Sequence, residues 1–428
     1  MLPFFPVPMD VGQQGYVEIR AEERVRTGND VSSEETELKP QLRYDAIWQG
    51  GMAHFMAYYN PRFILTSTFT RKSDDEVVAG PEAANQFNPN DKPLSVLHQA
   101  GLGLELQHPR WRLSAYQFGA YGPITTTGLL AWQPPWAGEG PPPDPLAIIP
   151  SNVAARFTLL FLQTMVLVPI RLSSRVSLTP RVDYNGWGGA DSTARATMPY
   201  TSGPGASLAL EVAATKYDRF TTTIGGGFFS TSFGDNRNNG TTYRAEASET
   251  YKHWFSRVVS SEISVGGSYA NDPTAGAKLF GTASAGLYFD DYGIAKYAPG
   301  APPWGAAPGH GDHLQVAIVA KASPWIDNFS GDLEQRAVGL LAINYSVDRT
   351  LLRAQVSAAK VYSALDSVAQ YSIFQVEGGL RYRFSPTFSA DGGVRFGTQN
   401  INNAIRYSQI TQVTMFAGLT WAPLPARF

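Results

Sequence analysis

The amino-acid sequence predicts an all-β fold: a single antiparallel up-and-down barrel that crosses a membrane with about 18 strands, or 16 in the alternative count. Three observations support this prediction. Apolar and polar residues alternate with a period of two along almost the whole chain. Short and long connections alternate between these segments. The chain is also poor in charge (16%) and rich in aromatic residues (12%), which is unusual for a surface that faces water.

The first two predicted strands show the alternation most clearly. In residues 16–26 the odd positions are apolar except for Glu23, whereas the even positions from Glu18 onwards are charged. In residues 38–48 the polar positions are the odd ones, from Lys39 to Asp45. Further alternating segments follow at 101–107, 207–212, 259–269, 313–321, 352–358, 374–383, 388–396 and 412–421. The pattern as a whole predicts about 18 strands of roughly 11 residues, close to the length that a tilted strand needs to cross a bilayer.

The connections divide into two groups by length. Short turns surround Gly50, Pro109 and Pro386, while long polar loops fall at 71–93 and 122–150. Short turns on one side and long loops on the other are typical of membrane barrels, and termini on the short-turn side require an even number of strands. Soluble β-sandwiches, propellers and solenoids also alternate. The chain shows no fixed internal repeat, and aromatic residues gather near the strand ends, so a membrane barrel is favoured.

Composition excludes several other classes of protein. The net charge is −2, whereas a dedicated nucleic-acid-binding protein is normally basic. The absence of Cys removes disulfides, thiolate nucleophiles, iron–sulfur clusters and Cys-ligated zinc. The longest mostly apolar run, residues 157–170, is shorter than the roughly 18 residues of a membrane-spanning helix. Residues 1–10 lack a basic region before their apolar stretch, so no signal peptide is expected in this numbering.

The alternating hairpins, the last strand over 413–421 and the terminal Phe428 resemble Gram-negative outer-membrane β-barrel proteins of the porin kind. In that class an aromatic C-terminal residue is part of the signal read by the assembly machinery. The resemblance covers nearly the whole chain, but it is one of architecture and indicates no specific family. Pro423 and Pro425 are a departure from it, because they separate Phe428 from the last strand.

The resemblance implies a division of the chain and a location. Residues 1–15 would form an N-terminal periplasmic segment, 16–422 the transmembrane barrel and 423–428 a C-terminal tail. The chain would reside in the bacterial outer membrane. Its implied partners are outer-membrane lipid, lipopolysaccharide and the barrel-assembly machinery; a homo-oligomer is an open alternative, and no nucleic acid is expected.

The polar strand faces should line the lumen, because a barrel of 16–18 strands leaves an aqueous channel. The candidate pore-lining residues carry both signs: Glu18, Arg20, Glu22, Arg24, Arg43, Asp45, Glu105, Arg353, Glu377, Arg381, Asp391 and Arg395. Facing lipid, each Arg at the midplane would cost about 2–4 kcal/mol. Facing water, these charges either set an ion preference or pair across strands and stabilise the wall, and both roles can hold together.

Three further segments bear on whether the lumen is open. Residues 122–150 resemble the inward-folding third loop of porins, although an external lid or partner-contact surface is an equal alternative. The candidate residues of this constriction loop are Trp132, Trp136, Glu139 and Asp144. Residues 290–311 fall on the short-turn side and are either a plug, an insert or a turn. The strand over 157–170 is apolar on both faces, which indicates an inner cover, a subunit contact or a patch for a hydrophobic substrate.

No catalysis, cofactor or metal is expected. The only His cluster, Gly309 to His313, offers two imidazoles and a carboxylate, and a flexible turn is favoured there because no fourth ligand is in view. Nucleophile motifs and phosphate-binding glycine loops are missing. The predicted function is therefore a channel for passive diffusion of small polar solutes or ions. The alternatives are a plugged, non-conducting barrel that acts as a scaffold or binds a partner, and a transporter of hydrophobic compounds.

Overall fold

The computed structural model describes residues 12–28, 31–48, 52–71, 94–125, 156–234, 239–273, 275–291, 313–326, 333–363, 370–402, 407–423 and 426–427. These residues are almost entirely β-strand, with one short helix, α2 (Ser192–Thr197). The strands of the first half are β1 (Gly12–Gly28), β2 (Val31–Trp48), β3 (Ala53–Tyr59), β4 (Arg62–Arg71), β5 (Leu94–His108), β6 (Trp111–Thr125), β7 (Arg156–Leu167), β8 (Ile170–Arg171), β9 (Val176–Gly189) and β10 (Tyr200–Ala213). Those of the second half are β11 (Asp218–Ser232), β12 (Gly240–Trp254), β13 (Val259–Asp272), β14 (Gly276–Asp290), β15 (His313–Ile326), β16 (Leu333–Val347), β17 (Thr350–Ser363), β18 (Gln370–Arg383), β19 (Phe388–Asn402), β20 (Tyr407–Trp421) and β21 (Ala426–Arg427).

Three of the strands are interrupted, each near a proline. Pro61 separates β3 from β4, Pro169 separates β7 from β8, and Pro423 follows the end of β20 before β21. Proline lacks the N–H that a strand ladder needs, so the ladder breaks there. The two parts of each interrupted strand pair with the same neighbouring strand. Counting each interrupted strand once, the described residues form 18 strands, as the sequence predicts.

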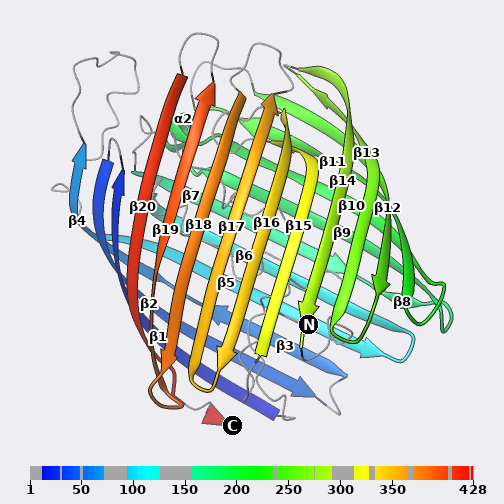
Figure 1. Cartoon of the computed structure of the whole chain (residues 1–428), viewed down its shortest axis with the longest axis horizontal. Coiled ribbons are helices and arrows are strands. Elements are labelled where there is room, and N and C mark those ends of the chain that lie inside the picture. The colour runs from blue at the N-terminus through cyan, green and yellow to red at the C-terminus, as the bar shows by residue number, and fades with distance from the viewer. Residues whose placement is uncertain are drawn as a thin grey trace.

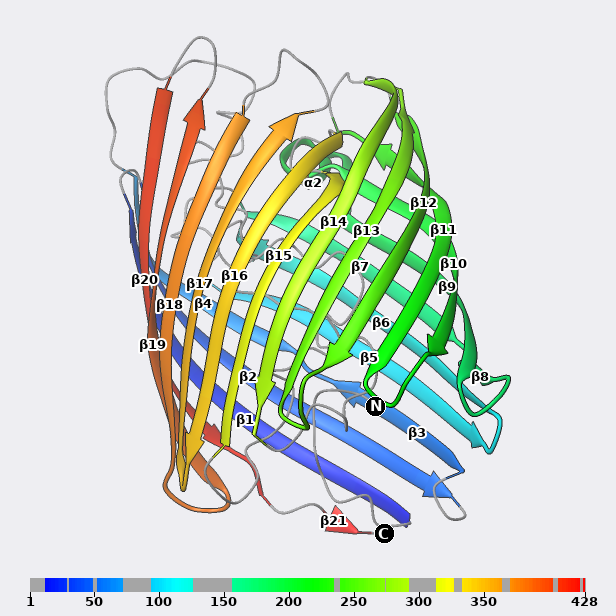
Figure 2. The same cartoon turned by 45° about the vertical axis from the view of Figure 1, so that its right-hand side comes forward.

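The strands form a closed antiparallel barrel in up-and-down order. Each strand pairs with its neighbours in the sequence, and the pairing of β1 with β20 joins the two edges of the sheet. In this closing pair Ile19 lies opposite Trp421 and Gly28 opposite Gln412. Figure 1 shows β15 to β20 as a steep front wall, and the turned view of Figure 2 shows β1 to β9 crossing behind it. No helix among the described residues is long and apolar enough to span a membrane.

The period-two pattern becomes an apolar outer face and a polar inner face. In β1, Val17 and Val25 are exposed on the outside, whereas Glu22 and Arg24 on the opposite face are buried inside the barrel. The other strands repeat this arrangement, and Val265 of β13 is 59% exposed on the outer face. Every second side chain points outward, and these side chains are mostly apolar, so the outer surface is suited to contact with lipid.

Short turns occupy one end of the barrel. Between β16 and β17 the turn consists of Asp348 and Arg349 alone, and Asp348 adopts a φ of 47°. Tight hairpin turns require positive φ, and Asp tolerates this conformation better than most residues. The outward aromatic residues Trp48, Tyr382 and Trp421 lie near this end, as an interfacial aromatic girdle would.

The structure moves three predicted boundaries. Strand β1 begins at Gly12 rather than at residue 16. Strand β6 continues to Thr125 because it stays paired with β7 as far as Arg156, so the third long loop begins after residue 125 rather than at 122. Within the tail at 423–428, β21 pairs with Gln14 and Gly15 of β1 and thus belongs to the sheet.

Other predictions fall outside the described residues. The constriction-loop candidates Trp132, Trp136, Glu139 and Asp144 lie there, as do residues 292–312 of the segment predicted as a plug, insert or turn. The flanking strands β14 and β15 do place that segment at the short-turn end of the barrel, as predicted.

We expect Val265→Arg to destabilise the barrel by about 2–4 kcal/mol, because this side chain faces lipid near the middle of β13. The matched control is Ser264→Arg, which places the same charge one residue away on the inner face. Denaturant unfolding of both variants in lipid vesicles measures the difference. Equal destabilisation by the two substitutions would contradict the assignment of the faces.

Candidate functional site

All the predicted pore-lining residues lie on the inner face of the barrel, opposite the exposed apolar positions of their strands. They differ in burial and in pairing. Glu22 and Arg24 of β1 and Asp45 of β2 are almost fully buried, whereas Glu377 of β18 and Arg395 of β19 are more accessible. Their part in permeation stays a prediction.

The most buried charges form an ion-pair network on the inner face of β1, β2 and β4. Glu37 lies at its centre, paired with Arg62, with Lys39 at 2.9 Å and with Arg24 at 3.3 Å. Arg24 extends the network to Glu22. The Glu37 and Arg62 side chains are 2% and 5% exposed. A buried charge is tolerated when opposite charges surround it, so this network fastens the strands together and leaves little charge for a passing solute.

Three more ion pairs lie on the inner face of β1, β18 and β19. Arg20 of β1 pairs with Glu22 at 2.7 Å and with Asp391 of β19 at 2.6 Å, reaching across β20. Arg395 pairs with Glu377 of the neighbouring β18 at 2.6 Å. The last pair is about one-third exposed, so it contributes less to stability than a buried pair and remains in contact with the lumen.

The remaining paired candidates are carboxylates with two partners each. Asp45 pairs with Arg43 at 2.6 Å and with the Nε2 atom of His54 at 2.8 Å. Glu105 pairs with Arg112 and also accepts a hydrogen bond from a tyrosine hydroxyl of β6. Thus the predicted cross-strand pairing accounts for most of the candidate charges.

Arg353 and Arg381 are different, because neither has an ion-pair partner among the described residues. The register places Arg353 opposite Gly379 and Arg381 opposite Leu351, so the two guanidinium groups share the inner face of neighbouring strands. Both lie close to the short-turn ends of β17 and β18. Glu18 is near enough to Arg381 to interact electrostatically. The pair therefore presents positive charge to the lumen at this end of the barrel.

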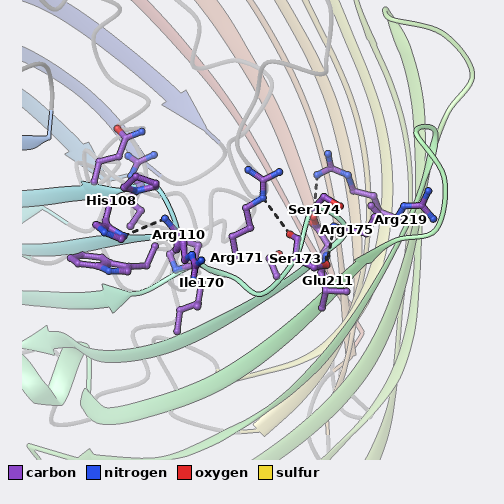
Figure 3. Close-up of a pocket in the computed structure, with 17 residues that line it drawn as sticks. His108, Arg110, Ile170, Arg171, Ser173, Ser174, Arg175, Glu211 and Arg219 are labelled. Atoms are coloured by element: carbon purple, nitrogen blue, oxygen red, sulfur yellow. Dashed lines mark hydrogen bonds and ion pairs between the residues drawn. The ribbon is translucent and has the colours of Figure 1, made fainter.

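A basic pocket occupies the same end of the barrel, in the wall formed by β5 to β11. Its volume is about 390 Å³, and Figure 3 shows its side chains around the β8–β9 turn. Five arginines line it: Arg110, Arg112, Arg171, Arg175 and Arg219. Arg219 pairs with Glu211 at 3.1 Å, and Arg112 pairs outside the pocket with Glu105. Arg110, Arg171 and Arg175 have no ion-pair partner in the described part of the chain, so the pocket carries net positive charge.

The inner side of the apolar strand β7 is covered, which is one of the three predicted alternatives for residues 157–170. Phe157, Leu159 and Phe161 are at most 5% exposed. They belong to a cluster that also contains Met56, Tyr58, Leu97, Phe118, Ala120, Ile124, Trp187, Ala194 and Met198. Ala194 belongs to α2, whose N-cap Asp191 accepts a hydrogen bond from the Ala194 N–H. The helix thus packs onto the inner wall near the long-loop end, as Figure 2 shows.

Sequence reasoning missed several members of this site. Glu37 and Glu35 continue the polar odd positions of β2, so the alternation from Lys39 to Asp45, followed backwards, contained the signal. Arg62 follows the proline that interrupts a strand, and no periodic pattern marks its direction. The pocket arginines lie in or beside short turns, where a sequence indicates a turn but not the direction of its side chains.

We expect Glu37→Gln to lower the free energy of unfolding by about 3–5 kcal/mol, because it leaves Arg62, Lys39 and Arg24 without their shared carboxylate. Glu377→Gln removes a more exposed pair and should cost no more than about 1 kcal/mol. Equilibrium unfolding in detergent compares the two variants. Equal losses of unfolding free energy in the two variants would contradict a special role of the ion-pair network around Glu37 in stability.

Comparisons with known proteins give a limited result. No family model and no curated protein matches the chain. Among solved structures it is similar to the siderophore receptor PirA from Pseudomonas aeruginosa (TM-score 0.45, 8% identity, 98% of this chain and 81% of that one). It is also similar to Acinetobacter baumannii OccAB4, with a TM-score of 0.42 and 11% identity over 97% of this chain and 100% of that one. A third similar structure is the FrpB iron transporter from Neisseria meningitidis, with a TM-score of 0.48 and 9% identity over 94% of this chain and 64% of that one. With these TM-scores below 0.5, the similarities add nothing about function to what the barrel itself shows.

Proposed function

We propose that the chain is an outer-membrane channel through which small polar solutes or ions diffuse passively, with a preference for anions at its short-turn mouth. The observation that carries this proposal is a closed barrel of 18 strands with a charged inner wall. Barrels of this size leave an aqueous channel unless something fills them. The apolar outer face provides the contact with lipid.

Burial around the wall supports an open path on one side of the lumen. The network on β1, β2 and β4 and the apolar cluster on β3 to β9 are packed. On β12 and β13, by contrast, the inner charges stay accessible: Arg244 and Glu246 are 32% and 40% exposed, and Glu262 is 35% exposed. A solute would therefore pass along β12 and β13, where these charged groups remain in contact with water.

The anion preference follows from the unpaired arginines. Arg353 and Arg381 lie on one wall, and the pocket containing Arg110, Arg171 and Arg175 lies in another part of the wall at the same end. Positive groups at the mouth raise the local concentration of anions and repel cations.

One observation favours the second candidate, a plugged scaffold. Helix α2 and the buried cluster with Phe118 and Phe161 occupy part of the lumen near the long-loop end. If this packing extends across the barrel, no path remains. Nothing in the described wall favours a transporter of hydrophobic compounds, because the inner apolar residues are covered.

Planar-bilayer recording of the refolded protein distinguishes these candidates. We expect discrete conductance steps, because the accessible inner charges of β12 and β13 indicate a water-filled path. Ala194→Asp should increase the conductance by loosening the packing of α2 on the wall. Electrical silence of protein whose insertion is verified by heat-modifiable gel mobility would exclude the channel and leave the scaffold.

We expect Arg353→Gln and Arg381→Gln to shift the reversal potential in a salt gradient toward cation preference. The permeability ratio of anion to cation should fall at least about twofold in the double variant, because two positive charges without ion-pair partners among the described residues leave the mouth. The control is Lys360→Gln, which removes the same charge from the outer face, where Lys360 lies over the ring of Tyr362. An equal shift in the control would contradict the role of the mouth arginines.

A further inference from the structure

Two carboxylates and an imidazole meet where β14 ends and β15 begins. The His313 Nε2 atom lies 2.9 Å from Asp290 Oδ1 and 3.3 Å from Asp291 Oδ1. The ligand atoms of the three residues lie within 4.8 Å of one another. The side chains of Asp290 and His313 are 2% and 7% exposed, while Asp291 is 36% exposed. The cluster is therefore built into the inner wall and open to water on one side.

The backbone holds these side chains in place. Asp290 pairs in register with Gln315, and the Gln315 Nε2 atom donates a hydrogen bond to Asp290 Oδ2 at 3.0 Å. The Leu314 N–H donates to Asp291 Oδ2 at 2.8 Å. Each carboxylate thus uses one oxygen to accept a structural hydrogen bond and turns the other toward His313. This arrangement orients ligand atoms, as outer hydrogen bonds do around metal ligands.

The distances match those between neighbouring ligands of one metal ion. Atoms bound at about 2.0–2.2 Å, with bond angles of about 90–110°, lie about 2.8–3.6 Å apart. Both contacts of His313 Nε2 fall in this interval. One imidazole with two carboxylates suits a borderline divalent ion such as Zn²⁺ better than Ca²⁺ or Mg²⁺, which prefer oxygen alone.

We propose that Asp290, Asp291 and His313 bind a divalent transition-metal ion, with Zn²⁺ as the probe, at the base of the β14–β15 connection. The ion would replace the two contacts of the imidazole with bonds from all three residues. Its remaining coordination positions would face the open side, where water can bind. Because the site joins the end of β14 to the start of β15, it would fasten these two strand ends together independently of any channel activity.

The chain offers two internal comparisons. His54 pairs with Asp45, and His253 pairs with Asp218, both at short distance. Among the described residues, neither forms a group of three ligand atoms like that around His313. A single carboxylate beside an imidazole makes an ion pair, whereas a second carboxylate adds the ligand that a metal needs. These two pairs are therefore matched controls for histidine substitution.

The test measures zinc binding by the EDTA-treated, refolded full chain in detergent, using calorimetry and the bound metal that remains after desalting. We expect one strongly bound Zn²⁺ per chain. His313→Gln and Asp291→Asn should each weaken binding about 100-fold or more. His54→Gln and His253→Gln should leave it unchanged. Zinc should also raise the unfolding temperature of the wild type but not of the His313 variant.

Asp291→Asn should fold like the wild type, because Asp291 lies outside the strands and an asparagine side chain can still accept the hydrogen bond from the Leu314 N–H. This variant therefore separates loss of zinc binding from loss of folding. Heat-modifiable gel mobility checks that every variant is folded. Absence of tight zinc in the folded wild type would overturn the proposal. Equal losses from His54→Gln and His313→Gln would overturn it as well, since they would indicate nonspecific binding by the histidines of the chain.

Discussion

The closing pair of β1 and β20 is the constraint on which the rest of the structure depends. Inside a bilayer no water is available for backbone N–H and C=O groups, so every strand needs a partner on both sides. Once Ile19 lies opposite Trp421, the sheet has no free edge in the membrane, and its two faces become an outside and an inside. The alternation of side chains then decides what meets lipid and what meets the lumen. All the charges discussed above owe their position to this closure.

The inner wall is divided into unequal parts. Around β1 to β9, buried ion pairs and apolar side chains pack on the inner wall much as they would in a soluble core. Around β12 and β13 the charges are only partly covered. The charges differ in the same way: Glu37 is surrounded by cations that cancel its charge, while Arg353 and Arg381 have no ion-pair partner among the described residues. Charged side chains thus stabilise the packing of the wall in one region and contribute to the electrostatic potential of the lumen in the other.

Much of this could be predicted from the sequence, because the signals are local. Period-two alternation predicts which face each charge occupies, so it places Arg20 and Asp391 inside without any knowledge of the contact between them. Their pairing across β20 could not be predicted, since it depends on register between opposite ends of the chain. The cover over Phe161 was only one of three alternatives, because burial by α2 is a contact between distant segments. The cluster of Asp290, Asp291 and His313 could not be predicted either, because it brings together two strand ends that are separated by a long connection in the sequence.

The topology also has a consequence for how the chain folds. Every pairing but the closing one joins strands that are neighbours in the sequence, so each can form as a local hairpin with a modest loss of chain entropy. The contact between β1 and β20 instead requires both ends of the polypeptide to meet. Until it forms, the sheet has two open edges, each able to pair with another chain. The final ordering step is thus the one that protects the protein from aggregation, and a chain that ends before β20 would retain both open edges.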